Sequence, residues 1–163
     1  MPRILSIDYG SKRTGLAVTD PLKILAGGLA GIHTKDLENF LTEYFKNEAV
    51  ELVIIGYPVN RDKSDTDATP LVRAFINRFK KIFPIMPIIK VDERNTSVMA
   101  VQSMVQSGMK KKDRQNKNLV DEIAATIMLQ EYLNTIIWWF ILFIVTLVGN
   151  FVPFNKNQSV APQ

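Results

Sequence analysis

One short apolar run restricts the fold of this chain more than any other feature. The four residues 52–55 (LVII) are all apolar, and Gly56 ends the run. A strand with one face in water shows alternation, whereas a continuous run of this length is typical of a strand buried on both faces. Such a strand needs helices on both sides of its sheet, so the run predicts an α/β fold.

Shorter patterns on either side complete the predicted order of elements. Strands are expected at 3–8, 15–19, 28–32 and 87–92, in addition to the buried run. Helices are expected over 37–45, after Thr69-Pro70, over 96–107 and over 119–133, with a basic loop between the last two. Asp36 is a candidate N-cap, and Thr69 is expected to cap the helix that begins at Pro70. This order predicts a mixed sheet, with a three-strand antiparallel meander and parallel strands reached through helical crossovers.

Composition excludes several classes of site. The chain has no cysteine, which rules out disulfide scaffolds, thiolate zinc sites, iron–sulfur clusters and cysteine nucleophiles. Its 163 residues suit one compact domain, and its net charge of +4 permits an anionic partner. The N-terminus has no long apolar segment or cleavage site of the secretory kind, so a cytoplasmic location is expected.

The mean hydropathy of +0.04 is high for a basic soluble protein, and the excess lies in the last thirty residues. Lys156 is the one charged residue in 134–163, and 136–148 is an uncharged apolar run. We therefore expect a domain at 1–133 and a hydrophobic tail at 134–163. The tail has three interpretations: a C-terminal membrane anchor, a helix that packs on the domain or a partner, and a non-native extension from a reading-frame change. Even extended to Val152, the run is at the lower limit of what spans a bilayer.

Acidic residues are predicted to meet at one edge of the sheet. Asp8 ends the first strand, and Asp92 and Glu93 end the strand at 87–92. Asp121 lies near the start of the last helix of the domain. Groups at the carboxyl ends of neighbouring strands converge on one crevice in an open α/β sheet, so we expect these carboxylates to lie together.

Asp121 is expected on the packing face of its helix. It shares that face with Ala124, Ala125 and Met128, which lie three, four and seven positions further along. An ionised carboxylate on such a face is costly unless it is paired or bound to metal. The alternative is an ordinary acid of the first helical turn, favoured by the helix dipole.

The pattern of charges suits metal-dependent chemistry on phosphate. Carboxylates without histidine or cysteine favour Mg²⁺ or Mn²⁺, and two such ions about 4 Å apart can activate water and stabilise the leaving oxygen in phosphodiester cleavage. The lone histidine, His33, is expected to be structural. Cations beside the carboxylates would offset the repulsion between those carboxylates and a phosphate backbone. The alternative for a basic run is an ordinary solvated loop. The candidate cations are Lys12 and Arg13 in the first turn, and Lys110, Lys111, Lys112 and Arg114 in the basic loop 110–117, whose fifth cation is Lys117.

Four motifs in order resemble one family. They are 8–15 (DYGSKRTG), 56–60 (GYPVN), 92–96 (DERNT) and 118–125 (NLVDEIAA). Together they resemble the YqgF-type nucleases, also described as pre-16S ribosomal RNA nucleases or RuvX-like Holliday junction resolvases, over about residues 3–133. The resemblance implies a ribonuclease-H-like fold.

The resemblance also implies roles for single residues. The acidic metal triad falls on Asp8, Glu93 and Asp121, and the pattern favours Glu93 over its neighbour Asp92. The implied nucleic-acid contacts are Lys12, Arg13 and Arg94. Three residues, Gly56, Pro58 and Asn60, would shape the rim of the site. The family often has a glycine soon after the position of Asn60, and residues 61–64 of this chain contain none.

The main expectation is a metal-dependent endonuclease that processes the 5′ end of precursor 16S rRNA with two Mg²⁺ or Mn²⁺ ions, with a homodimer as a further expectation. A Holliday junction resolvase acting on branched DNA would use the same site. An actin-like ATPase or sugar kinase would need a second domain that this length does not supply. A non-catalytic ribosome-associated factor, with purely structural acids, is the last alternative.

Overall fold

A computed structural model describes residues 1–60, 62–92 and 96–149. The chain divides into two compact units, Met1–Leu133 and Asn134–Gln163. The last helix, α5 (Lys117–Gly149), contributes residues to both units.

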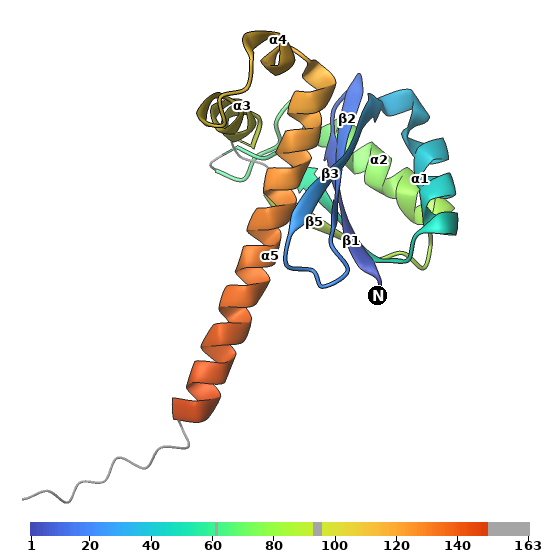
Figure 1. Ribbon diagram of the computed structural model, residues 1–163. Helices are drawn as coiled ribbons and strands as arrows, with labels where there is room; N and C mark the ends of the chain where they lie inside the picture. Colours follow the sequence, from blue (N-terminus) through green and yellow to red (C-terminus); the bar gives the residue numbers. More distant parts are fainter. Residues whose placement is uncertain (61, 93–95, 150–163) are drawn as a thin grey trace, which may run out of the picture. The chain divides into compact units, whose positions relative to one another are not determined.

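A five-stranded mixed sheet forms the centre of the first unit, with strand order β3-β2-β1-β4-β5 (Figure 1). The antiparallel pairs β1–β2 and β2–β3 form the predicted meander, and β4 and β5 are added in parallel beside β1. The apolar run lies in β4, where Val53, Ile54 and Ile55 are fully buried. The strands are β1 (Arg3–Tyr9), β2 (Arg13–Thr19), β3 (Ala26–His33), β4 (Val50–Tyr57) and β5 (Ile88–Asp92).

Helices cover both faces of this sheet, as the buried run requires (Figure 1). On one face, α1 (Leu37–Asn47) and α2 (Thr69–Ile82) pack over a core that includes Leu5 and Phe75. On the other face, the first half of α5 packs over a smaller core that includes Ile4 and Ala125. The predicted α/β class with a mixed sheet is therefore confirmed.

The structure differs from expectation at two helix starts. Asp36 occupies the N-cap position of α1, but its side chain makes no capping hydrogen bond because a 3₁₀ turn (Thr34–Asp36) already leads into the helix. Thr69 is the first residue of α2 rather than its cap, and Ala68 precedes it. The Thr69 hydroxyl instead donates to the carbonyl oxygen of Pro58 (2.5 Å), which ties the start of α2 to the loop after β4.

The segment between α3 (Thr96–Gln106) and α5 also differs from the predicted loop. Residues Lys111–Arg114 form a single helical turn, α4, because Lys110 has extended backbone angles and its carbonyl oxygen accepts from the amides of Asp113 and Arg114. The basic run is therefore an ordered turn, with Lys110, Lys111 and Lys112 exposed.

The second unit is described over residues 134–149, which continue α5 beyond the predicted end at Leu133. Its apolar side chains from Ile136 to Val145 are each between 41% and 70% exposed. By length and composition alone, the stretch Lys117–Thr146 could cross a membrane, and it is the one such helix in the described part of the chain. The part of this stretch before Asn134, however, supplies buried residues to the core of the first unit. The three interpretations of the tail concern the residues after it, and all three stay predictions.

Candidate active site

Asp8 lies on the face of the sheet that α5 covers. Ile4 packs in the core beneath α5 beside Ala125, whereas Leu5 and Ile7 pack in the core beneath α1 and α2. Side chains alternate between the two faces of a strand, so Asp8 shares the face of Ile4. Asp8 is half-buried near the C-terminal end of β1.

Gly15 brings Asp121 to Asp8. Gly15 on β2 pairs directly with Asp8 on β1, and paired residues of antiparallel strands present their side-chain positions on the same face. A Cβ atom built on Gly15 would lie 1.9 Å from the carbonyl oxygen of Asp121 and 2.9 Å from the amide nitrogen of Glu122. The backbone of α5 therefore rests directly on this glycine, and the two carboxyl-bearing residues lie around it.

A second glycine extends this contact. Gly31 on β3 pairs with Gly15, and its Cβ would lie 2.2 Å from the carbonyl oxygen of Asn118. We call Gly15 and Gly31 the glycine pair. Both clashes would be with helix backbone, so a side-chain rotation could not relieve them. The close approach of the first turns of α5 to the sheet therefore depends on the glycine pair.

The turn between β1 and β2 forms the opposite wall of the site. The amide of Gly10 donates to the carbonyl oxygen of Arg13 (3.0 Å), and a Cβ on Gly10 would lie 2.5 Å from that same oxygen. Thr34 holds this turn from outside, because its hydroxyl donates to the carbonyl oxygen of Gly10 (2.7 Å) and its amide donates to that of Lys12 (3.1 Å). An open cavity of about 280 Å³ lies between the turn and α5, lined by Gly10, Ser11, Lys12, Arg13, Lys117 and Asp121.

Arg13 and Asp121 form an ion pair inside this cavity. Nε of Arg13 lies 2.9 Å from Oδ2 of Asp121, and the two side chains are 31% and 25% exposed. Two residues named from the sequence, one as a nucleic-acid contact and one as a metal ligand, are thus in contact with each other. The surrounding atoms offer partial shielding from water, which strengthens such a pair relative to a fully exposed one.

Asp92 lies on the other face of the sheet. It pairs with Tyr57 in the parallel β4–β5 ladder, and Tyr57 packs against the core beneath α1 and α2. The alternation along β5 agrees, because Val91 packs in the core beneath α5. Asp92 is therefore not placed with Asp8 and Asp121, while Glu93 and Arg94 lie outside the described residues.

One cation of the predicted basic run, Lys117, lines the cavity, although the sequence analysis did not include it among the nucleic-acid contacts. Lys117, the first residue of α5, lines it together with Lys12 and Arg13. The signal was available, because Lys117 stands four residues before Asp121 and such residues share a helix face. The other four cations of the basic run line no part of this cavity; Lys110, Lys111 and Lys112 lie just before α5, and Arg114 is half-buried.

The donors of the site fit a hard divalent cation. Asp8 and Asp121 supply carboxylate oxygens, and neither histidine nor cysteine takes part, which is the chemistry that Mg²⁺ and Mn²⁺ prefer. Among the described residues, no group of three or more acidic, histidine or cysteine side chains gathers at one point. The described site therefore offers two carboxylates, and a third ligand would have to come from outside these residues.

Comparison with known families identifies the chain. The family model for RuvX, described as Holliday junction resolvase, matches residues 2–135. The chain belongs to the RuvX family. A relative from Flavobacterium johnsoniae is 54% identical over 135 residues, which cover 83% of this chain and 98% of the relative. One from Bacteroides fragilis is 50% identical over the same coverage, and both are named "Putative pre-16S rRNA nuclease".

A solved structure supports the fold. The Fowlpox virus resolvase, solved with its substrate Holliday junction DNA, superposes with a TM-score of 0.52 at 19% identity, over 82% of this chain and 98% of that one. The ribonuclease-H-like architecture implied by the four motifs is thereby confirmed. The match to the two RuvX relatives takes up nearly all of their length. Residues 136–163 lie outside the segment that the family model matches.

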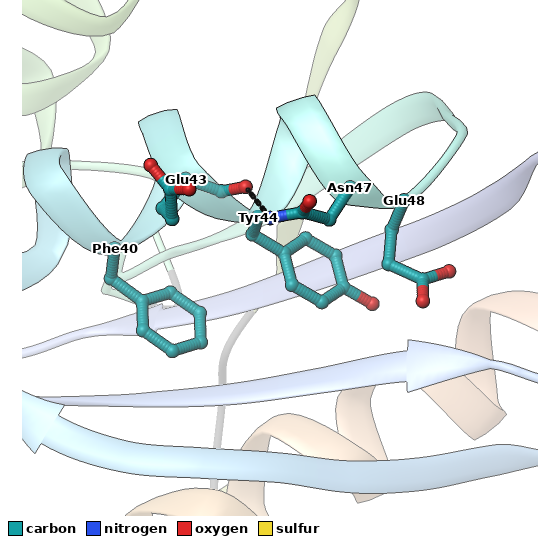
Figure 2. Close-up of a pocket in the computed structure, with 5 residues that line it drawn as sticks. All are labelled: Phe40, Glu43, Tyr44, Asn47 and Glu48. Atoms are coloured by element: carbon teal, nitrogen blue, oxygen red, sulfur yellow. Dashed lines mark hydrogen bonds between the residues drawn. The ribbon is translucent and has the colours of Figure 1, made fainter.

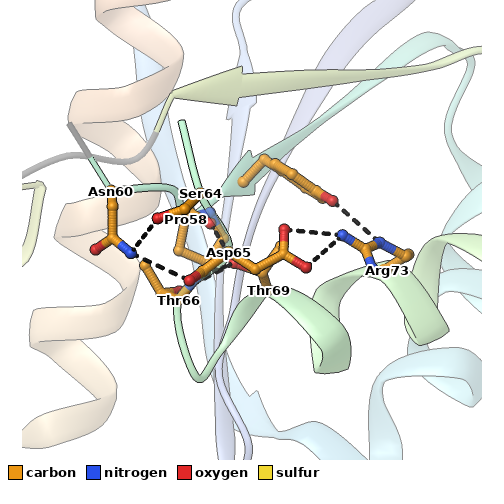
Figure 3. Close-up of polar contacts among 8 residues, drawn as sticks. Pro58, Asn60, Ser64, Asp65, Thr66, Thr69 and Arg73 are labelled. Carbon is orange, nitrogen blue, oxygen red and sulfur yellow. Dashed lines mark hydrogen bonds and ion pairs between the residues drawn. The ribbon is translucent and has the colours of Figure 1, made fainter. Parts of the chain in front are cut away.

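The loop after β4 lacks the glycine that the family often has soon after the position of Asn60. Lys63 lies in the left-handed region (φ 65°), and its amide donates to the carbonyl oxygen of Asn60 (2.9 Å). The loop is closed by polar contacts: the Asn60 amide group donates to Ser64 Oγ (2.9 Å), and Arg73 binds both carboxylate oxygens of Asp65 (2.9 and 2.7 Å) (Figure 3). The chain thus builds this rim without the glycine.

A second cavity, of about 350 Å³, lies along α1 (Figure 2). Helix α1 covers the face of the sheet opposite to the one that carries Asp8. The rings of Phe40 and Tyr44 lie parallel there, and burial together with the charge of Glu48 raises the pKa of the Tyr44 hydroxyl. Glu43 pairs with Lys46, and Glu48 pairs with Arg3. Acidic groups around aromatic rings repel phosphate, so this cavity is separate from the candidate site in both position and chemistry.

Proposed function

We propose that this chain is a metal-dependent endonuclease that hydrolyses phosphodiester bonds in precursor 16S rRNA. One observation carries the proposal: Asp8 pairs with Gly15, and the backbone of Asp121 rests on the same glycine, beside a cavity lined by Lys12, Arg13 and Lys117. Carboxylates and cations at one opening can hold a divalent metal and a phosphate group together. The names of the RuvX relatives point to the precursor 16S rRNA as the substrate.

The residues of the site would have two roles, metal binding and phosphate binding. Asp8, Asp121 and Glu93 would hold Mg²⁺ or Mn²⁺, which when bound activates water and offsets the charge of the leaving oxygen. Lys12 and Lys117 would bind the phosphate backbone at the cavity. Asp92 pairs with Tyr57 on the opposite face of the sheet, and this supports Glu93, rather than Asp92, as the third ligand.

The basic turn α4 would extend the nucleic-acid surface. Lys110, Lys111 and Lys112 are exposed immediately before α5, and each phosphate that they neutralise would release a counterion. Arg94 and Arg114 complete the proposed set of nucleic-acid contacts. Replacing the three lysines by methionine should reduce the slope of log affinity against log salt by about 0.7 for each phosphate of single-stranded RNA that the variant leaves unneutralised. An unchanged slope would mean that α4 does not belong to the nucleic-acid surface.

The test is cleavage of labelled precursor 16S rRNA by the full-length protein with Mg²⁺. Asp8→Asn is expected to lower the rate by more than about a hundredfold, because losing a ligand costs more than losing a residue that only orients one. Asp92→Asn is the matched control, since it removes the same charge from the other face, and it should leave the rate within a few-fold. An Asp8→Asn protein that cuts as fast as wild type would exclude Asp8 as a metal ligand of the reaction, whereas a wild-type protein that cuts no substrate would favour the non-catalytic ribosome-associated factor.

Branched DNA is the second candidate substrate. The RuvX family is described by Holliday junction resolution, and the Fowlpox virus resolvase shares the fold of this chain. A four-way DNA junction, included in the same assay, separates the two substrates: cleavage of the junction alone would replace the rRNA proposal. Sedimentation of the full-length protein in detergent, alone and with the junction, tests the predicted homodimer.

For location, we propose a cytoplasmic nuclease unit whose segment 134–149 inserts into lipid. Seven consecutive apolar residues, 138–144, cover every side of the helix, and a helix that is apolar all round suits a lipid environment. The Thr146 hydroxyl donates to the carbonyl oxygen of Leu142 (2.8 Å), which satisfies its polar group within the helix. Trp138 and Trp139, each 70% exposed, suit the membrane interface.

Flotation with liposomes tests this location. The full-length protein should rise with the vesicles, and the double variant Ile141→Lys/Val145→Lys should not, because each lysine costs about 2.5–3.5 kcal/mol in a bilayer centre. Both proteins should cut RNA at similar rates in detergent. Wild-type protein that stays at the bottom of the gradient would contradict the proposal and favour packing of the tail on a protein surface.

A further inference from the structure

The contact between Arg13 and Asp121 has a consequence for how the site binds its two ligands. Among the described residues, Arg13 makes one side-chain ion pair, through Nε to Oδ2 of Asp121 at 2.9 Å. A guanidinium has five N–H donors in a fork that matches a phosphate group. The Oδ2 atom of Asp121 accepts a hydrogen bond from the Arg13 guanidinium, and while it does so it is less available to a metal ion.

We propose that Arg13 exchanges Asp121 for a substrate phosphate, so that binding of nucleic acid releases Asp121 to bind the metal. This inference rests on the proposed function, because it assigns the phosphate and the metal to the same cavity. Arg13 is then a coupling residue between the two ligands. In the absence of nucleic acid it holds Asp121 back, and in its presence it binds the backbone.

The geometry allows the exchange. The main chain of Arg13 is fixed, since its carbonyl oxygen accepts from the Gly10 amide and the turn is held by Thr34. Its side chain is 31% exposed and lines an open cavity, so the guanidinium can leave Asp121 without movement of β2. Lys12 and Lys117 line the same cavity and would attract the phosphate that replaces the carboxylate.

The energies also favour an exchange over a permanent pair. An ion pair through one guanidinium nitrogen, between partly exposed side chains, is weak compared with a bidentate contact to phosphate. Coupling between two ligands of one protein is reciprocal and commonly amounts to about 5–150-fold in affinity. Because water reaches both side chains here, we expect the lower end of that range.

The first test needs neither metal nor activity. The affinity of the full-length protein for a fluorescein-labelled oligoribonucleotide is measured in EDTA by fluorescence anisotropy, at one fixed salt concentration. Asp121→Asn frees Arg13 and should tighten binding about fivefold more than Asp8→Asn, which removes the same charge from the same site. In an Arg13→Met background this extra gain should vanish. An equal effect of the two aspartate variants, or a gain that survives Arg13→Met, would overturn the exchange.

The second test measures the metal alone. Binding of Mn²⁺ without nucleic acid, followed by electron paramagnetic resonance, should be about fivefold tighter in Arg13→Met than in wild type. Lys12→Met is the matched control, because it removes one positive charge from the same cavity, and it should tighten Mn²⁺ binding less than Arg13→Met does. Equal affinities of the two methionine variants for Mn²⁺ would also overturn the exchange.

Failure of this inference is distinguishable from failure of the proposed function. A protein that shows the predicted differences in RNA and Mn²⁺ affinity but cuts no substrate supports the exchange and contradicts the nuclease. A protein that cuts precursor rRNA but shows equal effects in both binding tests supports the nuclease and contradicts the exchange.

Discussion

At the residue scale, two lysines of this chain occupy backbone conformations that favour glycine. Lys23 and Lys63 have φ values of 57° and 65°. In the left-handed region the Cβ of an ordinary residue crowds the following carbonyl oxygen, at a cost of about 1–2 kcal/mol. The chain tolerates this because each turn is closed by backbone bonds, from the Lys23 amide to the Asp20 carbonyl oxygen and from the Lys63 amide to that of Asn60.

Replacing Lys63 by glycine should therefore stabilise the protein. Relief of the crowded backbone outweighs the greater entropy of glycine in the unfolded chain, so the free energy of unfolding should rise by about 0.5–1 kcal/mol. The control is Lys80→Gly on the exposed side of α2, which should lower it by about 1 kcal/mol. Urea unfolding measures both, and a loss of stability in Lys63→Gly would contradict the assignment of strain.

Asp20 also acts at the scale of one residue, by holding the β2–β3 connection. Its carboxylate accepts from the amides of Leu22 (3.0 Å), Ile24 (2.8 Å) and Leu25 (2.8 Å). The hydrogen bond from the Leu25 amide, followed by those from Ile24 and Leu22, lowers the pKa of Asp20 below 3.8. A lowered folded-state pKa means that the charged form contributes stability above the unfolded pKa, and that this stability is lost as the pH falls through the folded value.

Asp20→Asn should consequently lower stability at pH 7 but not at strongly acidic pH. The gap in unfolding midpoint between wild type and variant should close as the pH falls below 3.8, where Asp20 of the folded wild type becomes protonated. Urea unfolding at a series of pH values from 7 to 2.5 measures the gap. A gap that is constant over this range would show that the carboxylate charge is not involved.

At the element scale, the position of Asp121 depends on how α5 docks on the sheet. The helix contributes Ala124 and Ala125, both buried, and the sheet contributes the glycine pair beneath the first turns. Small residues on both surfaces let the two backbones approach closely. A shift of α5 by even the size of a methyl group would move Asp121 relative to Asp8, so the docking controls the site as well as the fold.

Gly15→Ala should damage stability and metal binding together. Its added methyl group would meet the backbone of Asp121, and overpacking of this kind costs about 1–3 kcal/mol. Gly27→Ala is the matched control on β3, because its Cβ would meet nothing closer than the Val18 carbonyl oxygen at 3.8 Å. Thermal unfolding and Mn²⁺ binding by electron paramagnetic resonance measure both variants. If Gly15→Ala binds Mn²⁺ as tightly as Gly27→Ala does, the close docking of α5 is not required for the metal site.

At the scale of the whole molecule, the first unit has what it needs to fold. Its two cores lie on the two faces of one sheet and are closed by residues up to Leu133, which is 2% exposed. The RuvX family model matches residues 2–135, which is nearly the same span. The exposed apolar residues from Ile136 to Val145 raise the mean hydropathy without adding to either core.

A chain that ends at Leu133 should therefore keep its stability. Its Tm should lie within about 2 °C of the full-length value, because every core residue is kept and 1 kcal/mol corresponds to about 2–4 °C for a domain of this size. Differential scanning calorimetry in detergent compares the two proteins. A fall of more than about 8 °C would mean that the tail packs on the nuclease unit, and would support that interpretation over insertion into lipid.

The order of elements and the family are predictable from the sequence alone. Local patterns decide them: a continuous apolar run marks the buried strand β4, helical spacing marks α1 and α2, and four motifs in order mark the RuvX family. The strand ends likewise place Asp8 near the site. Each of these features is carried by residues close together in the chain, so no knowledge of distant contacts is needed.

The arrangement within the site is decided by tertiary structure, because it depends on register and on close approach between distant segments. The pairing of Asp8 with Gly15, and the backbone of α5 resting on that glycine, bring Asp121 into place. The pairing of Asp92 with Tyr57 turns that acid to the other face. The ion pair of Arg13 with Asp121 joins residues that no local pattern connects, since it exists only once β2 and α5 lie together.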